Sequence, residues 1–210
     1  MIELRPEDVI TTDEELRAIV PGPGQLVLRK ELTTLDEHAR RFIARSPFLV
    51  LASTAVSGRA DASPRGDPPG FVRVLDATTL FVPERPGNRR LDTLRNVLAN
   101  PQVGILFLVP GMTETLRVNG RASIVRAPAL LAAAEVSGRR PTLGLLVEVQ
   151  EVFFHCSRAF LRGGVWDHER WPATDDMPSL GTVLADQARI DGLSAEELDE
   201  DLAESDRRLY

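Results

Sequence analysis

The sequence predicts a mainly β (α+β) fold, an antiparallel barrel that is closed or nearly closed and carries peripheral helices. Three observations lead to this prediction. Six or seven short strand-like runs lie between residues 48 and 154, and turn signals such as Ser57-Gly58 and Pro110-Gly111 separate them. The 210 residues also show no break in composition near the middle. We therefore expect one core with extensions at both ends.

The first two predicted helices each begin at a capping box, a Ser or Thr followed three residues later by Glu. Residues 12–15 (Thr-Asp-Glu-Glu) open a helix through Val20, which ends at the Pro-Gly-Pro-Gly run. Residues 34–37 (Thr-Leu-Asp-Glu) open a second helix that extends to about Arg45. Apolar side chains at helical spacing predict its buried face: Leu35, Ala39, Phe42 and Ile43.

Short apolar runs rich in strand-forming residues follow as the predicted strands. Ser57-Gly58 joins the first two as a hairpin, and Asp76-Ala77-Thr78 is a second tight connection. Successive strands joined in this way form an antiparallel meander. The runs are 48–54, 60–63, 72–75, 79–82, 102–109, 115–125 and 143–154.

Further helices are predicted between and after the strands. Asn88 is placed to cap a helix over residues 89–99. Helices are also expected over 128–136, around 157–161 and after Ser194, where a third capping box begins an acidic helix. The helix over 89–99 should bury one apolar stripe: Leu91, Leu94, Val97 and Leu98.

The composition is typical of a soluble globular protein, with 43% hydrophobic and 27% charged residues. No apolar run approaches the roughly 20 residues that a membrane span requires, so no membrane partner is expected. The N-terminus lacks the pattern of a secretory signal, and Cys156 is the single cysteine, so we expect a cytoplasmic location. One cysteine and three scattered histidines predict no disulfide and no zinc site.

Charge is concentrated at the C-terminal end. Residues 191–210 hold eight acids and two arginines, so this segment alone accounts for the net charge of -6. The remaining chain is balanced and offers no electrostatic basis for nucleic-acid binding. Only Lys30 among the 25 basic residues is a lysine. A coding bias toward arginine explains this near absence of lysine. Only the positions of the arginines therefore bear on function.

Three arginine-bearing segments predict a site for one phosphate-bearing anion. They are residues 63–67 (Ser-Pro-Arg-Gly-Asp), residues 83–90 (Pro-Glu-Arg-Pro-Gly-Asn-Arg-Arg) and the strand 114–121. A phosphate is held by two or three arginines or hydroxyls and by free backbone N–H groups, which a helix N-terminus supplies. A flavin is the leading candidate for the anion.

Arg89 and Arg90 fall in the first turn of the predicted helix, where basic side chains oppose the helix dipole unless an anion is bound. The alternative is that they pair with Asp92 or Glu84 on the surface, and that Arg65 is a solvated turn residue. These segments alone leave both interpretations open.

Six motifs occur along the chain in an order that resembles that of a known family. This family is the pyridoxamine 5'-phosphate oxidase-like FMN-binding split-barrel family, and the likeness is closest to a subgroup of FMN-dependent enzymes of unassigned substrate. The motifs are 47–53 (Pro-Phe-Leu-Val-Leu-Ala-Ser), 63–67, 86–90, 100–104 (Asn-Pro-Gln-Val-Gly), 116–120 (Leu-Arg-Val-Asn-Gly) and 153–162 with Val165-Trp166.

This resemblance covers residues 34–172 and implies an antiparallel six-stranded split β-barrel with peripheral helices. The expected domains are an N-terminal extension (1–33), the FMN-binding split-barrel domain (34–172) and a C-terminal acidic helical extension (173–210). The resemblance also implies a homodimer with non-covalent FMN at the subunit interface. The activity implied is that of an FMN-dependent oxidoreductase, with hydride transfer from a reduced donor and no indispensable protein base.

The same resemblance implies roles for particular residues. Arg65 and the Asn88-Arg89-Arg90 segment would hold the phosphate and ribityl chain, and the Ser63 region and Val82-Pro83 would approach the flavin ring. Arg117, Arg158, Arg162 and Trp166 would close the site, from the same or the other subunit, although Trp166 is equally typical of a core or interface aromatic. The full set of expected FMN contacts is Ser63, Pro64, Arg65, Gly66, Val82, Pro83, Asn88, Arg89, Arg90, Arg117, Arg158, Arg162 and Trp166.

The sequence also departs from this family. Pyridoxamine phosphate oxidase has a C-terminal arginine-histidine pair for the substrate phosphate, and this chain has no convincing match, so oxidation of a B6 vitamer is not expected. Arginine replaces the usual lysine among the phosphate ligands, and Gly163-Gly164 stands where relatives commonly have a serine. The substrate and the catalytic residues therefore stay unassigned.

Two other functions are compatible with the sequence. One is a non-catalytic flavin-binding or sensing protein, and the other is a split barrel that binds a different phosphorylated small molecule. A nucleophile-base pair of Cys156 and His155 is not expected, because neighbours on a strand point to opposite faces.

Overall fold

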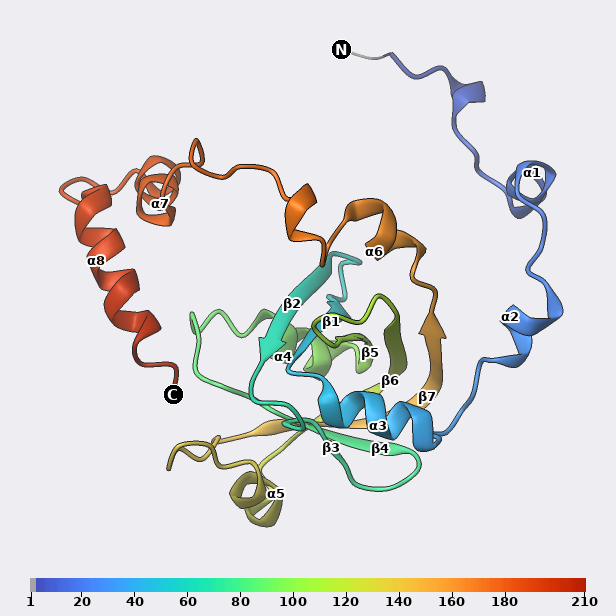
Figure 1. The fold of residues 1–210 in the computed structure, drawn as a ribbon, viewed down its shortest axis with the longest axis horizontal. Coiled ribbons are helices and arrows are strands. Elements are labelled where there is room, and N and C mark those ends of the chain that lie inside the picture. Colours follow the sequence, from blue (N-terminus) through green and yellow to red (C-terminus); the bar gives the residue numbers. More distant parts are fainter. Residues whose placement is uncertain (1–2) are drawn as a thin grey trace.

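One curved antiparallel sheet of seven strands forms the body of the protein (Figure 1). The computed structural model describes residues 3–210. Hydrogen-bonded neighbours follow the order β2-β1-β5-β6-β7-β4-β3, so β2 and β3 are the edges of an incompletely closed barrel. The strands are β1 Phe48–Thr54, β2 Ala60–Gly66, β3 Arg73–Val74, β4 Thr79–Pro83, β5 Gln102–Leu108, β6 Thr115–Val125 and β7 Gly144–His155.

The prediction of six strands is wrong by one. Every strand-like run in the sequence forms a strand, and the smallest, β3, has two residues that pair only with β4. Strand β2 is also longer than predicted, because it continues from Ser63 through Pro64 to Gly66. An edge strand tolerates the missing N–H of proline, so residues 63–66 are strand and not a turn.

Helices lie around the sheet and in both extensions. The sequence-based prediction lacks the α-helices α2 and α7 and the 3₁₀ helices η1 and η2, and α5 is shorter than predicted. The observed helices are η1 Pro6–Asp8, α1 Asp13–Ile19, α2 Gln25–Arg29, α3 Glu37–Arg45, α4 Asp92–Ala99, α5 Pro128–Ala133, α6 Arg158–Gly163, η2 His168–Arg170, α7 Leu180–Ala188 and α8 Ala195–Asp206.

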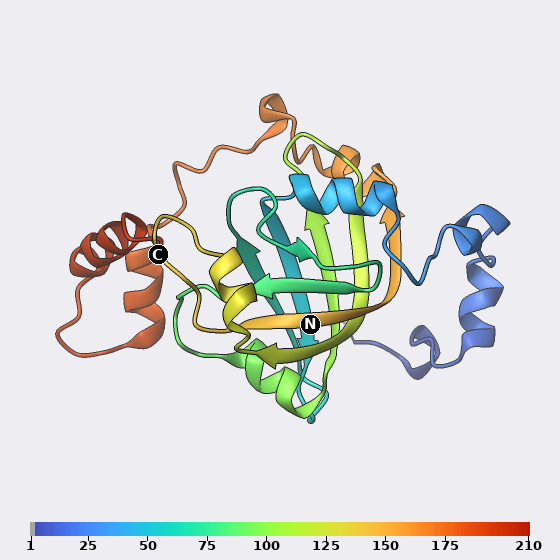
Figure 2. The same ribbon diagram turned by 90° about the horizontal axis from the view of Figure 1, so that it is seen from below.

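The core lies inside the curved sheet, and α3 lies across one end of the barrel (Figure 2). Alternate residues of the strands point inward, so Leu49 and Leu51 of β1 and Phe107 of β5 are completely buried. The Phe42 ring of α3 meets Phe154 of β7 edge-to-face at 5.4 Å between centroids. The predicted buried face around α3 is confirmed for all four of its residues: Leu35, Ala39, Phe42 and Ile43.

The starts of three helices test the capping signals. Thr12 and Ser194 cap α1 and α8 through complete capping boxes, as predicted. Helix α3 instead begins after Asp36, whose carboxylate accepts the Ala39 N–H at 2.8 Å. Thr34 is therefore not the cap, because the helix begins two residues later and Asp36 accepts one of its free N–H groups.

The apolar stripe predicted for α4 is half confirmed. Leu94 and Val97 are buried, whereas Leu91 lies in the preceding loop and is exposed. Leu98 is also exposed, because the helix turns Thr93 rather than Leu98 toward the sheet.

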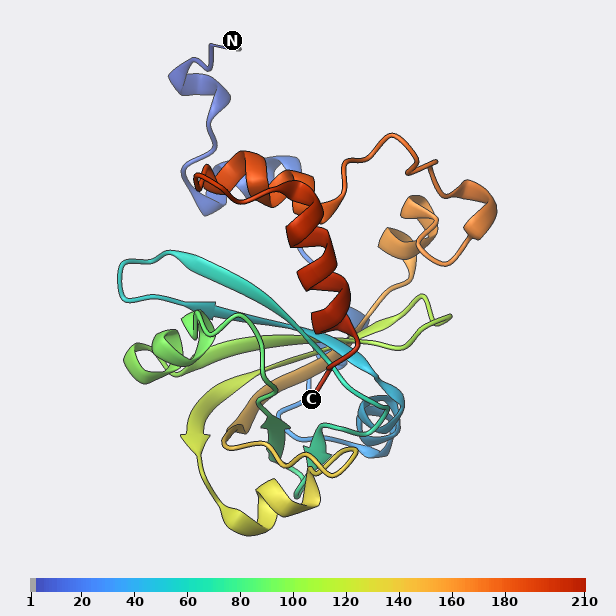
Figure 3. The ribbon, with the colours of Figure 1, turned by 90° about the vertical axis from the view of Figure 1, so that its left-hand side faces the viewer.

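The two extensions lie on opposite sides of the barrel (Figures 1 and 2). Helices η1, α1 and α2 contain no buried residue, and this segment meets the barrel where Leu32 pairs with Val152 of β7. Helices α7 and α8 pack on each other (Figure 3), and the Gly181 N–H donates to the Asp199 carboxylate at 2.7 Å. Within residues 3–210, no helix has the length and hydropathy of a membrane span.

Candidate functional site

A groove with a volume of about 1240 Å³ lies where the sheet curls back on itself. Its walls are the end of β2 and the loop from β4 to α4, which belong to opposite ends of the strand order. The walls are in direct contact, because Arg65 of β2 lies 3.4 Å from Glu84 beyond β4. The lining residues are 61–68, Phe71, 83–94, 140–143, Leu209 and Tyr210.

Arg65 lines this groove and its side chain is only 16% exposed. Its Nη1 donates to the Ser63 hydroxyl and the Pro64 carbonyl, and its Nη2 faces the Glu84 carboxylate. The Nε–H is buried and has no hydrogen-bond partner within the described part of the chain. A buried donor without a partner is costly, so this position favours an incoming acceptor.

Glu84 is the acid that faces Arg65. Burial raises the pKa of the Glu84 carboxyl, and the Arg65 guanidinium offsets only part of that effect. Glu84 therefore takes up a proton more readily than an exposed glutamate does. A phosphate in the groove can compete with this carboxylate for Arg65.

Arg85, Asp67 and Tyr210 form a second cluster in the groove. The Arg85 Nε donates to Asp67 Oδ2 at 2.5 Å, and its Nη2 donates to the Ala134 carbonyl at 2.8 Å. The Tyr210 hydroxyl donates to Asp67 Oδ1 at 2.5 Å, and the Tyr210 ring lies 5.5 Å from the Arg85 guanidinium carbon. The hydrogen bond to Asp67 raises the pKa of Tyr210.

Sequence reasoning missed this cluster. Asp67 and Arg85 belong to two of the arginine-bearing segments but were not among the expected contacts. Their pairing could have been suspected from an acid and an arginine in neighbouring motifs. Tyr210 carried no signal, because it is 143 residues from Asp67 in the sequence.

The loop 86–91 does not extend the helix as predicted. Helix α4 begins only at Asp92, and Arg89 has a φ of 61°, in the left-handed region that an α-helix excludes. Asn88 caps no helix, because its Oδ1 accepts the Arg90 N–H at 3.0 Å in an Asx-turn. The Arg90 guanidinium pairs with Asp92 at 2.8 Å, one of the two surface pairs that the sequence offered as the alternative to anion binding.

A polar network holds α4 against the strands beneath the groove. Asp61 Oδ2 accepts the Thr93 hydroxyl at 3.0 Å, and the Asn96 amide donates to Ser53 Oγ at 2.9 Å. Ser53 and Thr93 are buried, so these bonds replace contacts with water. The network joins β1, β2 and α4 and fixes the helix end that faces the groove.

The groove brings together most of the expected contacts. Val82 does not line it, because this side chain points into the barrel core and is 2% exposed. The expected contacts that do line it are Ser63, Pro64, Arg65, Gly66, Pro83, Asn88, Arg89 and Arg90.

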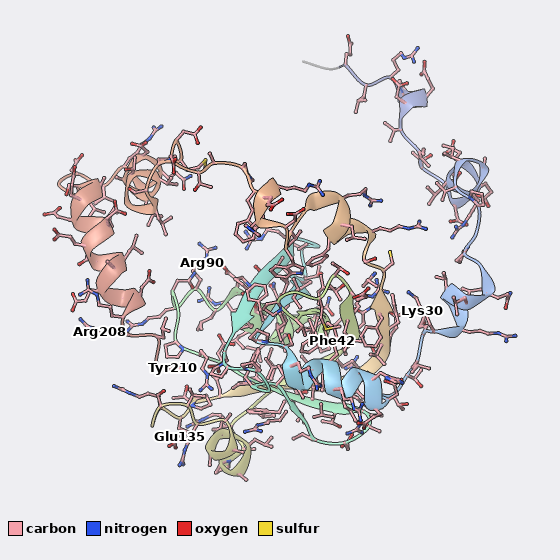
Figure 4. The ribbon with its side chains drawn as sticks, viewed as in Figure 1. Lys30, Phe42, Arg90, Glu135, Arg208 and Tyr210 are labelled. Atoms are coloured by element: carbon pink, nitrogen blue, oxygen red, sulfur yellow. The ribbon has the colours of Figure 1, made fainter. Side chains whose placement is uncertain are left out.

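Arg117 lies outside the groove of its own chain, on β6. Its Nη2 donates to Glu151 at 2.6 Å, and its guanidinium stacks on the Phe153 ring at 4.2 Å. Lys30 lies over the same ring at 5.0 Å. Figure 4 shows Lys30 on the side of the barrel opposite to Tyr210.

The remaining expected contacts are near α6 and also lie outside the groove. Arg158 and Arg162 belong to α6 and are exposed. The Trp166 indole N–H donates to the Met112 carbonyl at 2.7 Å, which ties this segment to the β5–β6 turn. None of these residues lines the groove of its own chain.

His155 and Cys156 occupy the end of β7 and the residue after it. Burial lowers the pKa of His155, and the charges of Arg117 and Lys30 lower it further. Cys156 is exposed. No group of three or more His, Cys, Asp or Glu side chains within residues 3–210 is placed to hold a metal ion.

A family model and several solved structures are similar to parts of this chain. A model of the pyridoxamine 5'-phosphate oxidase family matches residues 35–156, and no curated protein matches the chain. HupZ of Group A Streptococcus is 20% identical, with a TM-score of 0.47 over 57% of this chain and 93% of HupZ. An FMN-binding, pyridoxamine 5'-phosphate oxidase-related protein from Nostoc punctiforme is 17% identical, with a TM-score of 0.41 over 56% and 78% of the chains. HutZ, the heme storage protein of Vibrio cholerae, is 18% identical, with a TM-score of 0.38 over 57% and 93%.

The family match spans more than half of the chain and runs from the segment before α3 to the residue after β7. It includes both walls of the groove, with Arg65 and the loop 86–91. The resemblance inferred from the order of the motifs is confirmed. The chain belongs to the pyridoxamine 5'-phosphate oxidase family.

Proposed function

We propose that this chain is an FMN-binding flavoprotein oxidoreductase whose substrate is unassigned. The observation that carries the proposal is the buried, unpartnered Nε–H of Arg65 in the groove between β2 and the β4–α4 loop. A phosphate oxygen is the acceptor that this donor lacks, and arginine is well suited to bind it. The family match supports the choice of FMN as the phosphate-bearing ligand.

The size and charge of the groove fit a mononucleotide. Its volume of about 1240 Å³ is larger than that of a typical ligand pocket, about 300–1,000 Å³. Five arginines and four acids line it, so its formal charge is +1. The arginines are Arg65, Arg85, Arg89, Arg90 and Arg140.

In this proposal, Arg65 and the loop 86–91 hold the phosphate and ribityl chain. Gly87 lets a ligand approach the backbone closely, because it has no side chain and the space where a Cβ would lie is open to 4 Å. Bound FMN would supply hydride transfer between a reduced donor and an acceptor. The protein would contribute binding, orientation and charge. No protein base is assigned a role.

The proposal includes a cytoplasmic homodimer that uses neither nucleic acid nor a membrane. The groove of a single chain is not lined by Arg117, Arg158, Arg162 or Trp166. In a dimer they would close the FMN site of the other subunit. This arrangement accounts for expected contacts that a single chain does not bring together.

An FMN titration of the purified protein, followed by visible absorption, tests the proposal. We expect a yellow complex, and we expect the double variant Arg65→Ala with Arg89→Ala to bind FMN at least about tenfold more weakly, because hydrogen bonds to charged groups are among the strongest. Arg95→Ala is the matched control, because Arg95 is exposed on α4 and does not line the groove. A colourless protein that ignores FMN would overturn the proposal.

A non-catalytic flavin-binding or sensing protein is the second candidate. Tyr210 favours it, because a side chain of the protein itself occupies part of the groove. Steady-state oxidation of NADH or NADPH by the FMN-loaded protein separates the two. Turnover supports the oxidoreductase, whereas tight FMN binding without turnover of either donor supports the binding protein. Binding of inorganic phosphate without FMN would instead indicate a different phosphorylated ligand.

A further inference from the structure

We infer that Asp67 and Arg85 form a subsite for a planar aromatic group that bears a hydrogen-bond donor, and that Tyr210 occupies it as an intramolecular competitor. This inference deepens the proposed function and rests on it only where FMN is the competing ligand. It assigns a ligand class to part of the groove and a role to the C-terminal extension.

The subsite is rigid and desolvated. The Asp67 side chain is 0% exposed and that of Arg85 is 13% exposed. The Asp67 N–H donates to the Pro47 carbonyl at 3.0 Å, and Arg85 is anchored to the Ala134 carbonyl. The two side chains are therefore fixed from the barrel side, whatever lies in the groove.

The two oxygens of Asp67 face different partners. Oδ2 accepts from Arg85, whereas Oδ1 accepts only from the Tyr210 hydroxyl within the described chain. A buried carboxylate oxygen needs a donor, and removing the phenol would leave it unsatisfied. Another hydroxyl or N–H donor can take the same place.

Arg85 adds a second requirement, for an aromatic face. Its guanidinium lies 5.5 Å from the centroid of the Tyr210 ring, within the range of a cation–π contact. A ligand that replaces Tyr210 should therefore offer a flat ring beside Arg85 and a donor at the ring edge for Asp67. Phenols and N–H-bearing heteroaromatic rings, such as the flavin ring, meet both conditions. An aliphatic phosphate meets neither.

The C-terminal extension is otherwise loosely attached. Within the described chain, one side-chain hydrogen bond joins residues 173–210 to the barrel, and Tyr210 makes it. Helices α7 and α8 pack on each other, and the chain after α8 ends beside the barrel (Figure 3). Leu209 and Tyr210 at this end line the groove. Tyr210 lies between α8 and the barrel, on the side that also carries Arg90 and Glu135 (Figure 4).

This attachment makes ligand binding and tail docking compete. If Tyr210 fills the subsite for most of the time, the apparent affinity for a ligand equals the intrinsic affinity multiplied by the fraction of molecules whose subsite is open. Only a short segment must move, because residues 173–210 contribute no large side chain to the barrel core. A ligand therefore gains access through the release of one side chain, without any opening of the barrel.

The single tyrosine of the chain makes the docking directly observable. The full-length protein is labelled with ¹³C-tyrosine, and its one ring resonance is compared with that of the same protein in urea. We expect a shifted resonance in the native protein, and a return toward the released position when p-cresol or FMN is added. A native resonance at the released position without any ligand would overturn the inference.

Two variants test the competition by affinity. Tyr210→Ala should bind p-cresol and FMN about tenfold more tightly than the wild type, because the open fraction rises to one. Ser205→Ala, an exposed neutral position at the end of α8, is the matched control and should bind like the wild type. Equal affinities of Tyr210→Ala and the wild type for both probes would contradict the inference.

The outcomes separate this inference from the proposed function. If Tyr210→Ala binds p-cresol but no variant binds FMN, the subsite stands and the FMN proposal fails. If FMN binds, but both FMN and p-cresol have equal affinities for the wild type and Tyr210→Ala and leave the tyrosine resonance unchanged, the FMN proposal stands and the subsite inference fails.

Discussion

The barrel and the two extensions differ in how much apolar surface they bury. Phe107 of β5 is 0% exposed, whereas Leu26 of α2 is 81% exposed, although both belong to regular secondary structure. Backbone hydrogen bonds alone contribute little net stability to a short helix, and burial of apolar area contributes most of it. We therefore expect the barrel to account for most of the free energy of unfolding, and the helices of the extensions to unfold locally.

The largest expected effect comes from a matched pair of truncations. Phe107→Ala should lower the free energy of unfolding by about 4 kcal/mol, through reduced burial and a cavity in the barrel. Leu26→Ala should change it by less than about 0.5 kcal/mol. Urea unfolding of both variants measures the difference. A loss of more than about 1 kcal/mol in Leu26→Ala would show that α2 packs on another surface in solution.

A second pair compares the buried ion pair of the groove with a more exposed one. Asp67→Ala leaves Arg85 without its carboxylate in a buried site, and should cost about 3 kcal/mol. Glu151→Ala removes the partner of Arg117, whose side chain is 38% exposed, and should cost less than about 1 kcal/mol. The same urea titration measures both. Equal losses would mean that the groove is as open to water as the outer face of the sheet.

The pH dependence of FMN binding tests Glu84. Because its pKa is raised, the folded protein favours the protonated carboxyl, so its contribution to stability is fully present at low pH and is lost as pH rises through the raised pKa. Protonation also frees Arg65, so FMN affinity should rise as pH falls through that pKa. Glu84→Gln should bind FMN about tenfold more tightly at neutral pH.

The comparison of Glu84→Gln with the wild type at each pH cancels the ionisation of the FMN phosphate itself. Glu37→Gln is the control, because Glu37 is exposed, pairs with Arg41 on α3 and does not line the groove. An affinity ratio that stays constant with pH would exclude Glu84 as the titrating group.

The smallest expected effect on the barrel comes from the α7–α8 pair. A Cβ on Gly181 would lie 2.4 Å from the Ala195 carbonyl oxygen and 2.5 Å from the Asp199 carboxylate, so Gly181→Ala should separate the two helices. Hydrogen exchange should speed up within residues 180–206 and stay unchanged in the strands. Faster exchange in β1 or β5 would mean that the extension supports the barrel. Gly192→Ala is a poor control because its φ is 80°, so Gly22→Ala, with open space around it, is preferred.

Local signals in the sequence predicted much of the fold. Short apolar runs and turn signals located every strand, and the capping boxes at Thr12 and Ser194 are present as expected. Errors occurred where a side chain had a choice of partners. Asn88 could cap a helix or form an Asx-turn, and the left-handed conformation of Arg89 decided for the turn.

The candidate site was predicted in part. Arg65 and the loop 86–91 were expected to meet, and they line one groove. The sequence did not predict that Arg65 pairs with Glu84, or that Asp67 pairs with Arg85. These contacts join segments at opposite ends of the strand order, and their distance depends on how far the sheet curls.

The sequence by itself determined the strand runs, two helix caps, the acidic C-terminal segment and the family. These depend on residue periodicity, local hydrogen bonds and the order of motifs, all of which can be read along the chain. The tertiary structure alone decided which arginines share the groove, how each is neutralised, and that Tyr210 occupies it. The physical reason is that such contacts depend on sheet curvature and on the direction of a distant terminal segment, which no local pattern of residues encodes.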